Sequence, residues 1–446
     1  MPLQLEHVEL GKASHVDGTP VSFYAVVIDA TFPYKTSNGK YVCSMKITDS
    51  SIASGKKDSW AQLVLYARKF EDLPIVQRIG DVIRVNRSIL RLHNGRKQFN
   101  ASIYFNSSWA LFSSDKRDPE GNERGDAEPF GHNGKKFSFE KHEKDSLNRA
   151  RKFAQSHFAS NNVLSSDMHV ALSKASSQKN DFDVLAKVLQ IFEKDEFTNE
   201  LKIRDGSNKT WYVLALKLKF PHLAVNDVVR IRSAIYDETS RKNVLNLSHY
   251  SNILTFVSNS KLAKEIRNKV SDDRKADQAA LKDTVSMHPV MLSEVDKKHA
   301  NLPVTPLKDL FSDDADIARQ TTFRTHFCVS KIEPASVQEF CRVHDKKANK
   351  TSSAKGSKGG NYIYQVQFLV KGGSSSNNHY RVLLYTHDGL GKDFFGVNAT
   401  NLHSSAKDAK ALEGHAANLT KFNSWVDAVV ERRNGYYFIK DTKLIH

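Results

Sequence analysis

The chain has 446 residues, 39% of them hydrophobic, and a formal net charge of +16. This length and composition exclude a single small domain and a disordered chain, so about two to four globular domains are expected. The positive charge favours a polyanionic partner such as nucleic acid, although acidic proteins and membrane surfaces attract it as well. No apolar run approaches the roughly 20 residues of a membrane-spanning helix, so no membrane segment is expected.

Residues 1–112 form a first block of predicted strands. Alternating or β-branched runs predict strands over 23–29, 40–49 and 60–70, with a turn signal at 37–39. The alternation is typical of strands that bury one face and leave the other exposed.

The end of this block, residues 84–105, has the pattern of a β-hairpin. Asn94-Gly95 supplies the positive φ angles of a type I′ turn between two alternating runs. Strict alternation assigns these side chains to an apolar face: Leu90, Leu92, Phe99, Ala101, Ile103 and Phe105. The opposite face then carries Arg91, His93, Gln98 and Tyr104. Cations, amides and rings on one face suit the phosphates and bases of a single-stranded nucleic acid.

Residues 113–145 are rich in charge, Gly, Ser and Pro, and are predicted to be a linker. A second domain follows over 146–270, beginning with a helix. Its strands repeat the first block, because the run after Asn226-Asp227 echoes the run after Gly80-Asp81. Each repeat is long enough to be a domain.

Residues 271–311 are predicted to be a polar connector, and 312–446 a third block with a second hairpin signal at Asn434-Gly435. Each block has about five short strands, which favours small closed barrels over sandwiches of seven or more strands. The predicted fold class is therefore mainly β, with three OB-folds, each a five-stranded Greek-key barrel, in tandem.

The first barrel carries a candidate binding surface for single-stranded nucleic acid. OB barrels present the second and third strands and the adjacent loops to such ligands. The candidate residues are Lys35, Tyr41, Lys46, Phe70, Arg91, His93, Gln98 and Tyr104. The alternative is that Tyr41 and Phe70 belong to the core and that the cations form a solvated face.

The second barrel begins with two acids, Asp181 and Asp183, which alternation places on one face. Carboxylates on a strand that faces DNA suggest recognition of the N–H groups of guanine; simple solvated acids are the alternative. A metal site is less favoured, because no third ligand lies at a suitable spacing. Arg230 and Arg232 share a strand face by the same argument, and Phe197 is a further stacking candidate.

No enzymatic motif is present. The sequence has no GxxxxGK[ST] loop, GxSxG elbow or HExxH helix, and its three cysteines, Cys43, Cys328 and Cys341, form no CxxC pair. We therefore expect a protein that is not an enzyme, with no catalytic residues, no metal and no cofactor.

Long stretches of the chain resemble the alpha subunit of the ciliate telomere end-binding protein family, with the protection-of-telomeres proteins as more distant relatives. The stretches that carry the resemblance include FYAVVIDATFPYKT, SSWALFSSDKR, LKLKFPH, LSHYSNI and VERRNGYYFIKDTKLI. The resemblance implies three OB-folds, the first two forming a groove for a G/T-rich 3′ overhang. It also implies a nuclear, telomeric location, a beta-subunit partner bound by the third barrel, and the option of a homodimer on DNA.

Residue by residue, the resemblance implies DNA contacts at Lys35, Tyr41, Lys46, Phe70, Gln98, Tyr104, Phe105, Asp181, Asp183, Arg230, Arg232, His249 and Tyr250. Phe105 is implied only by the resemblance, because alternation places it on the core face. His93 and Phe197 stand where relatives have Tyr.

The resulting hypothesis is a telomeric single-strand-binding protein that caps the 3′ end by stacking, phosphate contacts and recognition of guanine by carboxylates and amides. The alternatives are a general single-strand binder and a scaffold that acts mainly through the third barrel.

Overall fold

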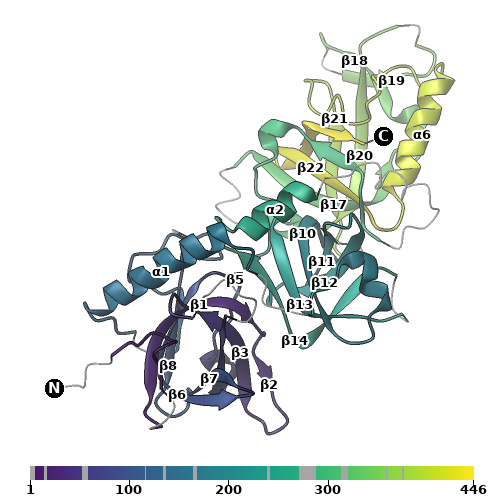
Figure 1. Cartoon of the computed structure of the whole chain (residues 1–446). Helices are drawn as coiled ribbons and strands as arrows, with labels where there is room; N and C mark the ends of the chain where they lie inside the picture. The colour runs from purple at the N-terminus through teal and green to yellow at the C-terminus, as the bar shows by residue number, and fades with distance from the viewer. Residues whose placement is uncertain are drawn as a thin grey trace. The chain divides into compact units, whose positions relative to one another are not determined.

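The computed structural model divides into two compact units (Figure 1). Unit 1 comprises Met1–Ile191 and Glu200–Ser271, and unit 2 comprises Phe192–Asn199 and Asp272–His446. The structure describes residues 6–14, 18–52, 59–115, 117–133, 137–163, 168–238, 242–270, 288–312, 320–348, 350–357, 359–373 and 376–445.

The first barrel is a closed five-stranded sheet in unit 1. Its strands are β1 (Val21–Ala30), β3 (Tyr41–Thr48), β4 (Ala61–Ala67), β6 (Val82–His93) and β7 (Arg96–Ser102). They run in the order β1-β3-β4-β7-β6, and pairing of β6 with β1 closes the barrel. The pair β4–β7 is parallel, whereas the other pairs are antiparallel.

The second barrel, also in unit 1, has the same strand order. Its strands are β10 (Phe182–Glu193), β11 (Thr198–Arg204), β12 (Thr210–Leu216), β13 (Val228–Tyr236) and β14 (Val244–Phe256). Their order is β12-β11-β10-β13-β14, and the parallel pair β12–β14 closes the ring.

The third barrel lies in unit 2. Its strands are β17 (Thr322–Glu333), β20 (Tyr362–Lys371), β21 (Tyr380–Tyr385), β22 (Ser424–Arg433) and β23 (Tyr436–Lys440). Pairing of β17 with both β20 and β22 closes it, with β21–β23 as the parallel pair. The three barrels share one topology, and the predicted fold class of three OB-folds in tandem is confirmed.

Short strands, α-helices and 3₁₀ turns lie outside the five-stranded barrels. The short strands are β2 (Tyr34–Lys35), β5 (Arg78–Ile79), β8 (Ser108–Phe112), β9 (Gly131–His132), β15 (Val290–Met291), β16 (Ser293–Val295), β18 (Cys341–Asp345), β19 (Lys350–Ser353) and β24 (Thr442–Leu444). The α-helices are α1 (Glu143–Ser160), α2 (Lys261–Lys269), α4 (Leu307–Leu310) and α6 (Ala406–Leu419). The 3₁₀ turns are η1 (Phe70–Asp72), η2 (Leu172–Ser177), η3 (Lys297–His299) and η4 (Val337–Glu339). Within the described residues, none of the helices combines the length and apolar character that crossing a bilayer requires.

Both Asn-Gly pairs form the predicted hairpin turns. Asn94 and Gly95 have φ values of 49° and 73°, and Asn434 and Gly435 have 49° and 80°. These positive values are those of a type I′ turn. Each pair joins the fourth and fifth strands of its barrel, which are β6–β7 and β22–β23.

The predicted apolar face of the first hairpin is correct only in part. Leu90, Phe99 and Ala101 are buried, but Leu92 is 51% exposed. From Arg91 onward β6 is exposed to its end, so its tip extends beyond the core and alternation no longer determines burial.

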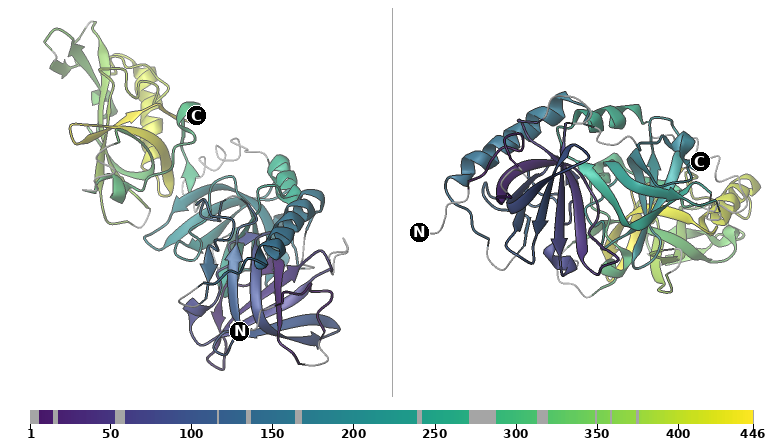
Figure 2. Two further views of the ribbon diagram at one scale, coloured as in Figure 1. Left: turned by 90° about the vertical axis from the view of Figure 1, so that its left-hand side faces the viewer. Right: turned by 60° about the horizontal axis from the view of Figure 1, so that its bottom comes forward.

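The predicted linker and helix boundaries need correction. The segment 113–145 contains β9, which pairs with β8 of the first barrel. As Figure 2 shows, helix α1 lies along the first barrel, because Leu147, Ala154 and Phe158 join its core. It also contacts the second domain, since the Asn259 side chain donates to the Gln155 carbonyl at 2.7 Å. An apolar helix stripe must be covered, and the nearest apolar surface is β1.

The predicted connector over 271–311 also needs correction. Within its described part, β15 pairs with β22, and Leu292, Leu307 and Leu310 are buried in the core of the third barrel. The C-terminal half of this segment is therefore part of the third domain.

The N-terminal segment closes one side of the first barrel. The ammonium of Lys97 donates hydrogen bonds to the carbonyl oxygens of Leu10, Gly11 and Ala13 at 2.8–2.9 Å. Asp49 accepts a further hydrogen bond from the Leu10 amide at 2.7 Å. These contacts satisfy the backbone of a segment that has few hydrogen-bonding partners of its own.

The two barrels of unit 1 are joined by backbone pairing. The end of β14 runs parallel to β5, with Thr255 opposite Arg78 and Phe256 opposite Ile79. The amide of Val257 then donates to the Ile79 carbonyl at 3.0 Å. Because β5 directly precedes the fourth strand of the first barrel, the last strand of the second barrel is held against the first.

We predict that Gly80→Ala destabilises this junction. Gly80 has φ +101°, and an added Cβ would lie 2.6 Å from a methyl group of Val257. Gly39 has φ +80° and open space around it, so Gly39→Ala serves as the control for backbone strain alone. Chemical denaturation should give Gly80→Ala an unfolding free energy lower than that of the control by a further ~1–3 kcal/mol. Equal losses for the two variants would contradict the close approach.

Candidate nucleic-acid interface

Aromatic rings from both barrels of unit 1 meet at their junction. Phe32 and Tyr34 follow β1, whereas His249 and Tyr250 lie on β14. Ring centroids of Tyr34 lie 5.6 Å from His249 and 5.8 Å from Tyr250, and Phe32 lies 6.2 Å from Phe220. The amide of Phe32 also donates to the Tyr250 carbonyl at 3.2 Å. The ring cluster is thus built from two domains.

Lys219 lies in the middle of this cluster. Its ammonium is 4.2 Å from the Phe32 ring centroid and donates to the His249 carbonyl at 3.2 Å. Burial lowers the pKa of Lys219 to about 8. A cation held over an aromatic face gains electrostatic stabilisation from the ring, which partly offsets its desolvation.

The predicted residues on the first barrel's second strand extend the cluster. Tyr41 begins β3, is half-buried, and lies 6.2 Å from the ring of Phe70. Phe70 is in turn 5.7 Å from Phe32. Lys35 is exposed beside Tyr41, with its ammonium 5.9 Å from the Tyr41 ring centroid. The expected strand over 60–70 ends earlier, at Ala67, and Phe70 lies in η1.

Lys46 and Arg96 both lie over the indole of Trp60. The Lys46 ammonium is 4.5 Å and the Arg96 guanidinium 3.7 Å from the ring centroid. Burial lowers the pKa of Lys46, although Asp29 opposes this effect. Trp60 is a residue that the sequence analysis did not select for the site.

Some of the polar residues predicted on the exposed face of the hairpin β6–β7 are exposed, and others are half-buried. Arg91 and His93 are exposed, and Gln98 is half-buried opposite Arg91, with its amide donating to Asn100 at 2.9 Å. Tyr104 is also half-buried, and the hydrogen bond that Lys40 donates to its hydroxyl at 3.2 Å lowers the Tyr104 pKa.

The exposure of Phe105 differs from the burial that strict alternation predicted. Strand β7 ends at Ser102, and Phe105 lies in the following turn, where it is 79% exposed. Alternation applies only within a strand, so the expected burial of Phe105 was wrong. Its ring centroid lies 6.0 Å from that of Tyr104.

Asp183 and Arg230 of the second barrel form a buried network with Asp29 of the first barrel. Asp183 accepts from the Arg230 guanidinium at 2.7 Å and from the Ser233 amide at 2.9 Å, so both carboxylate oxygens are engaged. Arg230 also contacts Asp29 of the first barrel at 3.3 Å. Burial alone would lower the Arg230 pKa, but Asp29 and Asp183 raise it above its ordinary value.

Asp183 is therefore buried and hydrogen-bonded, and the alternative of a simple solvated acid is wrong for this residue. The β10–β13 register shifts between Phe182 and Val184, so a bulge at Asp183 also breaks the alternation that paired it with Asp181. Asp181 is half-buried just before β10.

Phe197 belongs to the segment Phe192–Asn199 of unit 2. Its side chain is 62% exposed, and its amide donates to Asp195 at 2.9 Å.

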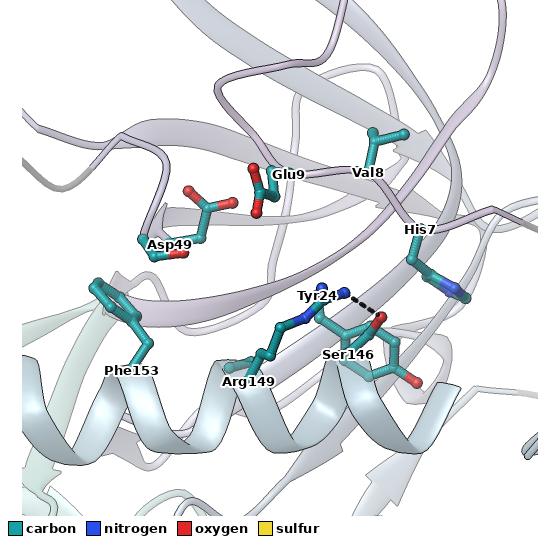
Figure 3. A pocket seen from close by; sticks show the side chains of 10 residues that line it. His7, Val8, Glu9, Tyr24, Asp49, Ser146, Arg149 and Phe153 are labelled. Carbon is teal, nitrogen blue, oxygen red and sulfur yellow. Dashed lines mark hydrogen bonds between the residues drawn. The ribbon is translucent and has the colours of Figure 1, made fainter. Parts of the chain in front are cut away.

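A separate pocket lies between the N-terminal segment and α1 (Figure 3). Its lining includes Glu9, Tyr24, Asp49, Arg149 and Phe153, and none of the predicted site residues.

Nearby, His7, His142 and Glu143 offer ligand atoms within 4.8 Å of one another. Glu143, however, accepts from Tyr24 at 2.9 Å and from Arg84 at 2.8 Å. The guanidinium already balances the carboxylate charge, which disfavours a cation there.

Several residues of the candidate interface could not be selected from the sequence. Phe32 and Tyr34 precede the selected Lys35 and lie between the strands predicted over 23–29 and 40–49, so alternation did not select them. Asp29 and Lys219 gave no sequence signal, because their partners lie in the other barrel or on a strand that is distant in the chain.

Comparisons with known proteins agree with this organisation. Residues 3–164 match a family described as telomeric single stranded DNA binding POT1/CDC13, and residues 171–268 match one described as the telomere end-binding protein alpha subunit OB2 domain. The telomere-binding protein subunit alpha of Sterkiella nova is 56% identical, covering 99% of this chain and 93% of that protein. The protein of that name from Stylonychia mytilus is 55% identical, with the same coverage. A solved structure of fission yeast Pot1 with ssDNA is 12% identical, covers 60% of this chain and 93% of that chain, and has a TM-score of 0.28.

Lys219 predicts a pH dependence of stability. Between about pH 8 and about pH 10.5 the unfolded lysine binds a proton that the folded one has released, so raising the pH favours folding. The resulting gain in the free energy of unfolding is complete above the pKa of the unfolded lysine and is lost as the pH falls through about 8. Denaturant unfolding across this range should show a smaller rise for Lys219→Met than for the wild type. Lys217→Met controls for the loss of one lysine from the same loop, and identical curves for Lys219→Met and wild type would contradict the assignment.

Proposed function

The chain belongs to the family of telomere-binding protein alpha subunits, and we propose that it binds and caps the single-stranded G/T-rich 3′ overhang of telomeres. In this proposal the DNA lies in a groove between the first and second OB-folds. The protein then acts in the nucleus, at chromosome ends, as a binding protein and not as an enzyme.

The observation that carries the proposal is the continuity of rings across the two barrels. Tyr41, Phe70 and Phe32 of the first barrel follow one another at centroid distances of 5.7–6.2 Å. Tyr34 then contacts His249 and Tyr250 of the second. A single strand exposes flat bases, and aromatic side chains stack on them whatever their identity.

Cations beside these rings supply the phosphate contacts in this proposal. Lys35 is exposed beside Tyr41, Arg91 is exposed on β6, and Lys46 is half-buried on β3. Such contacts release counterions, so affinity should fall steeply with salt.

Selectivity for guanine needs acceptors for its N–H groups. Gln98 and Asp181 are half-buried and serve as candidate acceptors. Asp183 is buried and both of its oxygens accept hydrogen bonds from the second barrel, so Gln98 and Asp181 are the more accessible acceptors. His93, Tyr104, Phe105, Arg230 and Arg232 complete the proposed contacts within unit 1.

A scaffold role through the third barrel is the second candidate function. Phe422 and Tyr436 of unit 2 are exposed aromatic residues, which are typical of protein-binding surfaces. We propose that the third barrel binds a beta subunit, while a homodimer on DNA is a further arrangement. A general single-strand binder is the remaining alternative, because stacking alone does not select a sequence.

Competition binding tests the telomeric assignment. At about 150 mM salt, where long-range electrostatic attraction is screened, a G/T-rich strand should displace a labelled probe far more effectively than oligo-dC of the same length. Equal competition by the two strands would favour the general binder.

Tyr41→Ala tests the stacking surface. Loss of one platform should weaken binding of every strand by ~1–3 kcal/mol, with little change in the ratio between G/T-rich and dC strands. The comparison variant is Tyr436→Ala in unit 2, which should leave DNA affinity unchanged. An unchanged affinity for Tyr41→Ala, measured by fluorescence anisotropy, would remove Tyr41 from the interface.

A further inference from the structure

Asp29 directs its hydrogen bonds away from its own barrel. It lies on β1, is 2% exposed, and uses one carboxylate oxygen to accept from Arg230 at 3.3 Å and from Arg232 at 3.2 Å. The other oxygen, Oδ1, is buried and makes no hydrogen bond within the described residues. The hydrogen bonds of this side chain therefore serve the second barrel.

Strand irregularities bring the network together. The β1–β3 register shifts between Val27 and Asp29, and the β13–β14 register shifts between Arg232 and Ala234. Ser233 has φ 55°, and its amide donates to Asp183. Bulges re-aim side chains and are frequent beside functional sites.

The two arginines differ in their exposure and in their hydrogen bonding. Arg230 is buried between Asp29 and Asp183, whereas the Arg232 side chain is 23% exposed. Arg232 uses only its Nε on Asp29, and its two terminal nitrogens contact no acceptor in the described part of the chain. Anchoring through Nε holds the guanidinium plane and leaves a pair of parallel donors on its outer edge.

A planar pair of donors matches a pair of acceptors. In a G/T-rich single strand, such pairs are two oxygens of a phosphate and the O6/N7 edge of guanine. The charges also fit, since Asp29 and Asp183 balance the two arginines. Arg232 is therefore held as an oriented hydrogen-bond donor rather than as a mobile cation.

We propose that Asp29 is a positioning residue for DNA binding, which orients the outer donor pair of Arg232 toward a paired acceptor of the strand. This inference rests on the proposed function. In this proposal a residue of the first barrel orients an arginine of the second. Asp183 instead stabilises the bulge at Ser233 by accepting from its amide.

A double-mutant cycle in the full-length protein tests the proposal. Asp29→Asn should weaken binding of a G/T-rich strand roughly tenfold, within the range that one bidentate arginine contact contributes. Arg232→Lys keeps the charge but lacks the planar fork. If Asp29 acts through Arg232, Asp29→Asn should have little further effect in the Arg232→Lys background. Additive losses, or an unchanged affinity for Asp29→Asn, would overturn the proposal.

Two DNA arms identify the acceptor. A loss of equal size on oligo-dT and on the G/T-rich strand assigns the donor pair to phosphate. A loss confined to the G/T-rich strand, and absent when guanine is replaced by 7-deazaguanine, assigns it to the guanine edge. Both outcomes support the positioning role. Failure of the wild type to prefer G/T-rich over dC strands would instead refute the proposed function, independently of the cycle.

Controls separate positioning from folding. Asp118→Asn removes another buried acid that accepts from an arginine, Arg124 at 2.9 Å, within segment 113–145, and should leave DNA affinity unchanged. Where Asp29→Asn lowers the melting temperature too far for binding assays, Asp29→Glu keeps the charge but displaces the carboxylate. It should also weaken binding, and wild-type affinity for a folded Asp29→Glu protein would refute the positioning role.

Discussion

Arg230 carries a charge that is almost completely removed from water, and the arrangement of unit 1 depends on how that charge is compensated. A buried guanidinium is tolerated only with carboxylate partners at hydrogen-bonding distance. One partner, Asp183, comes from its own barrel and the other, Asp29, from the first barrel. Separating the barrels would therefore leave buried charges with incomplete pairing. Backbone pairing between β14 and β5 adds a second, uncharged connection at the same junction. Together these contacts hold the two barrels in one relative position within unit 1.

The same junction concentrates the aromatic residues. Phe32 and Tyr34 reach their positions because β1 ends beside the second barrel, where the Phe32 amide bonds to Tyr250. Rings supplied by two domains can bind a strand without choosing its sequence, since every base has a flat face. Selection needs oriented polar groups, and in the proposed function Gln98, Asp181 and the guanidinium of Arg232 are the candidates for this role. Under that proposal, affinity and specificity come from different residues of one surface.

The remainder of the first barrel is closed by its own flanking segments. Lys97 binds three carbonyl oxygens of the N-terminal segment, and Glu143 at the start of α1 accepts from Arg84 and Tyr24. These contacts, with the apolar stripe of α1, cover β1 and β7 away from the ring cluster. The hairpin tip with Arg91 and His93 and the turn with Phe105 stay exposed.

The sequence by itself determined the three barrels, both Asn-Gly turns and most of the candidate rings, because strand periodicity and turn chemistry are local properties. It did not assign α1 to the first barrel, since an amphipathic helix can pack on either neighbour. It also misplaced Phe105 and Leu92, which lie where a strand ends or leaves the core, so alternation stops predicting burial. Asp29 and Lys219 could not be selected at all, because the partners that give each its role are distant in the chain. Only the tertiary structure decided that Asp183 is an internal partner of Arg230, since a bulge and the packing of two barrels determine which carboxylates lose their water.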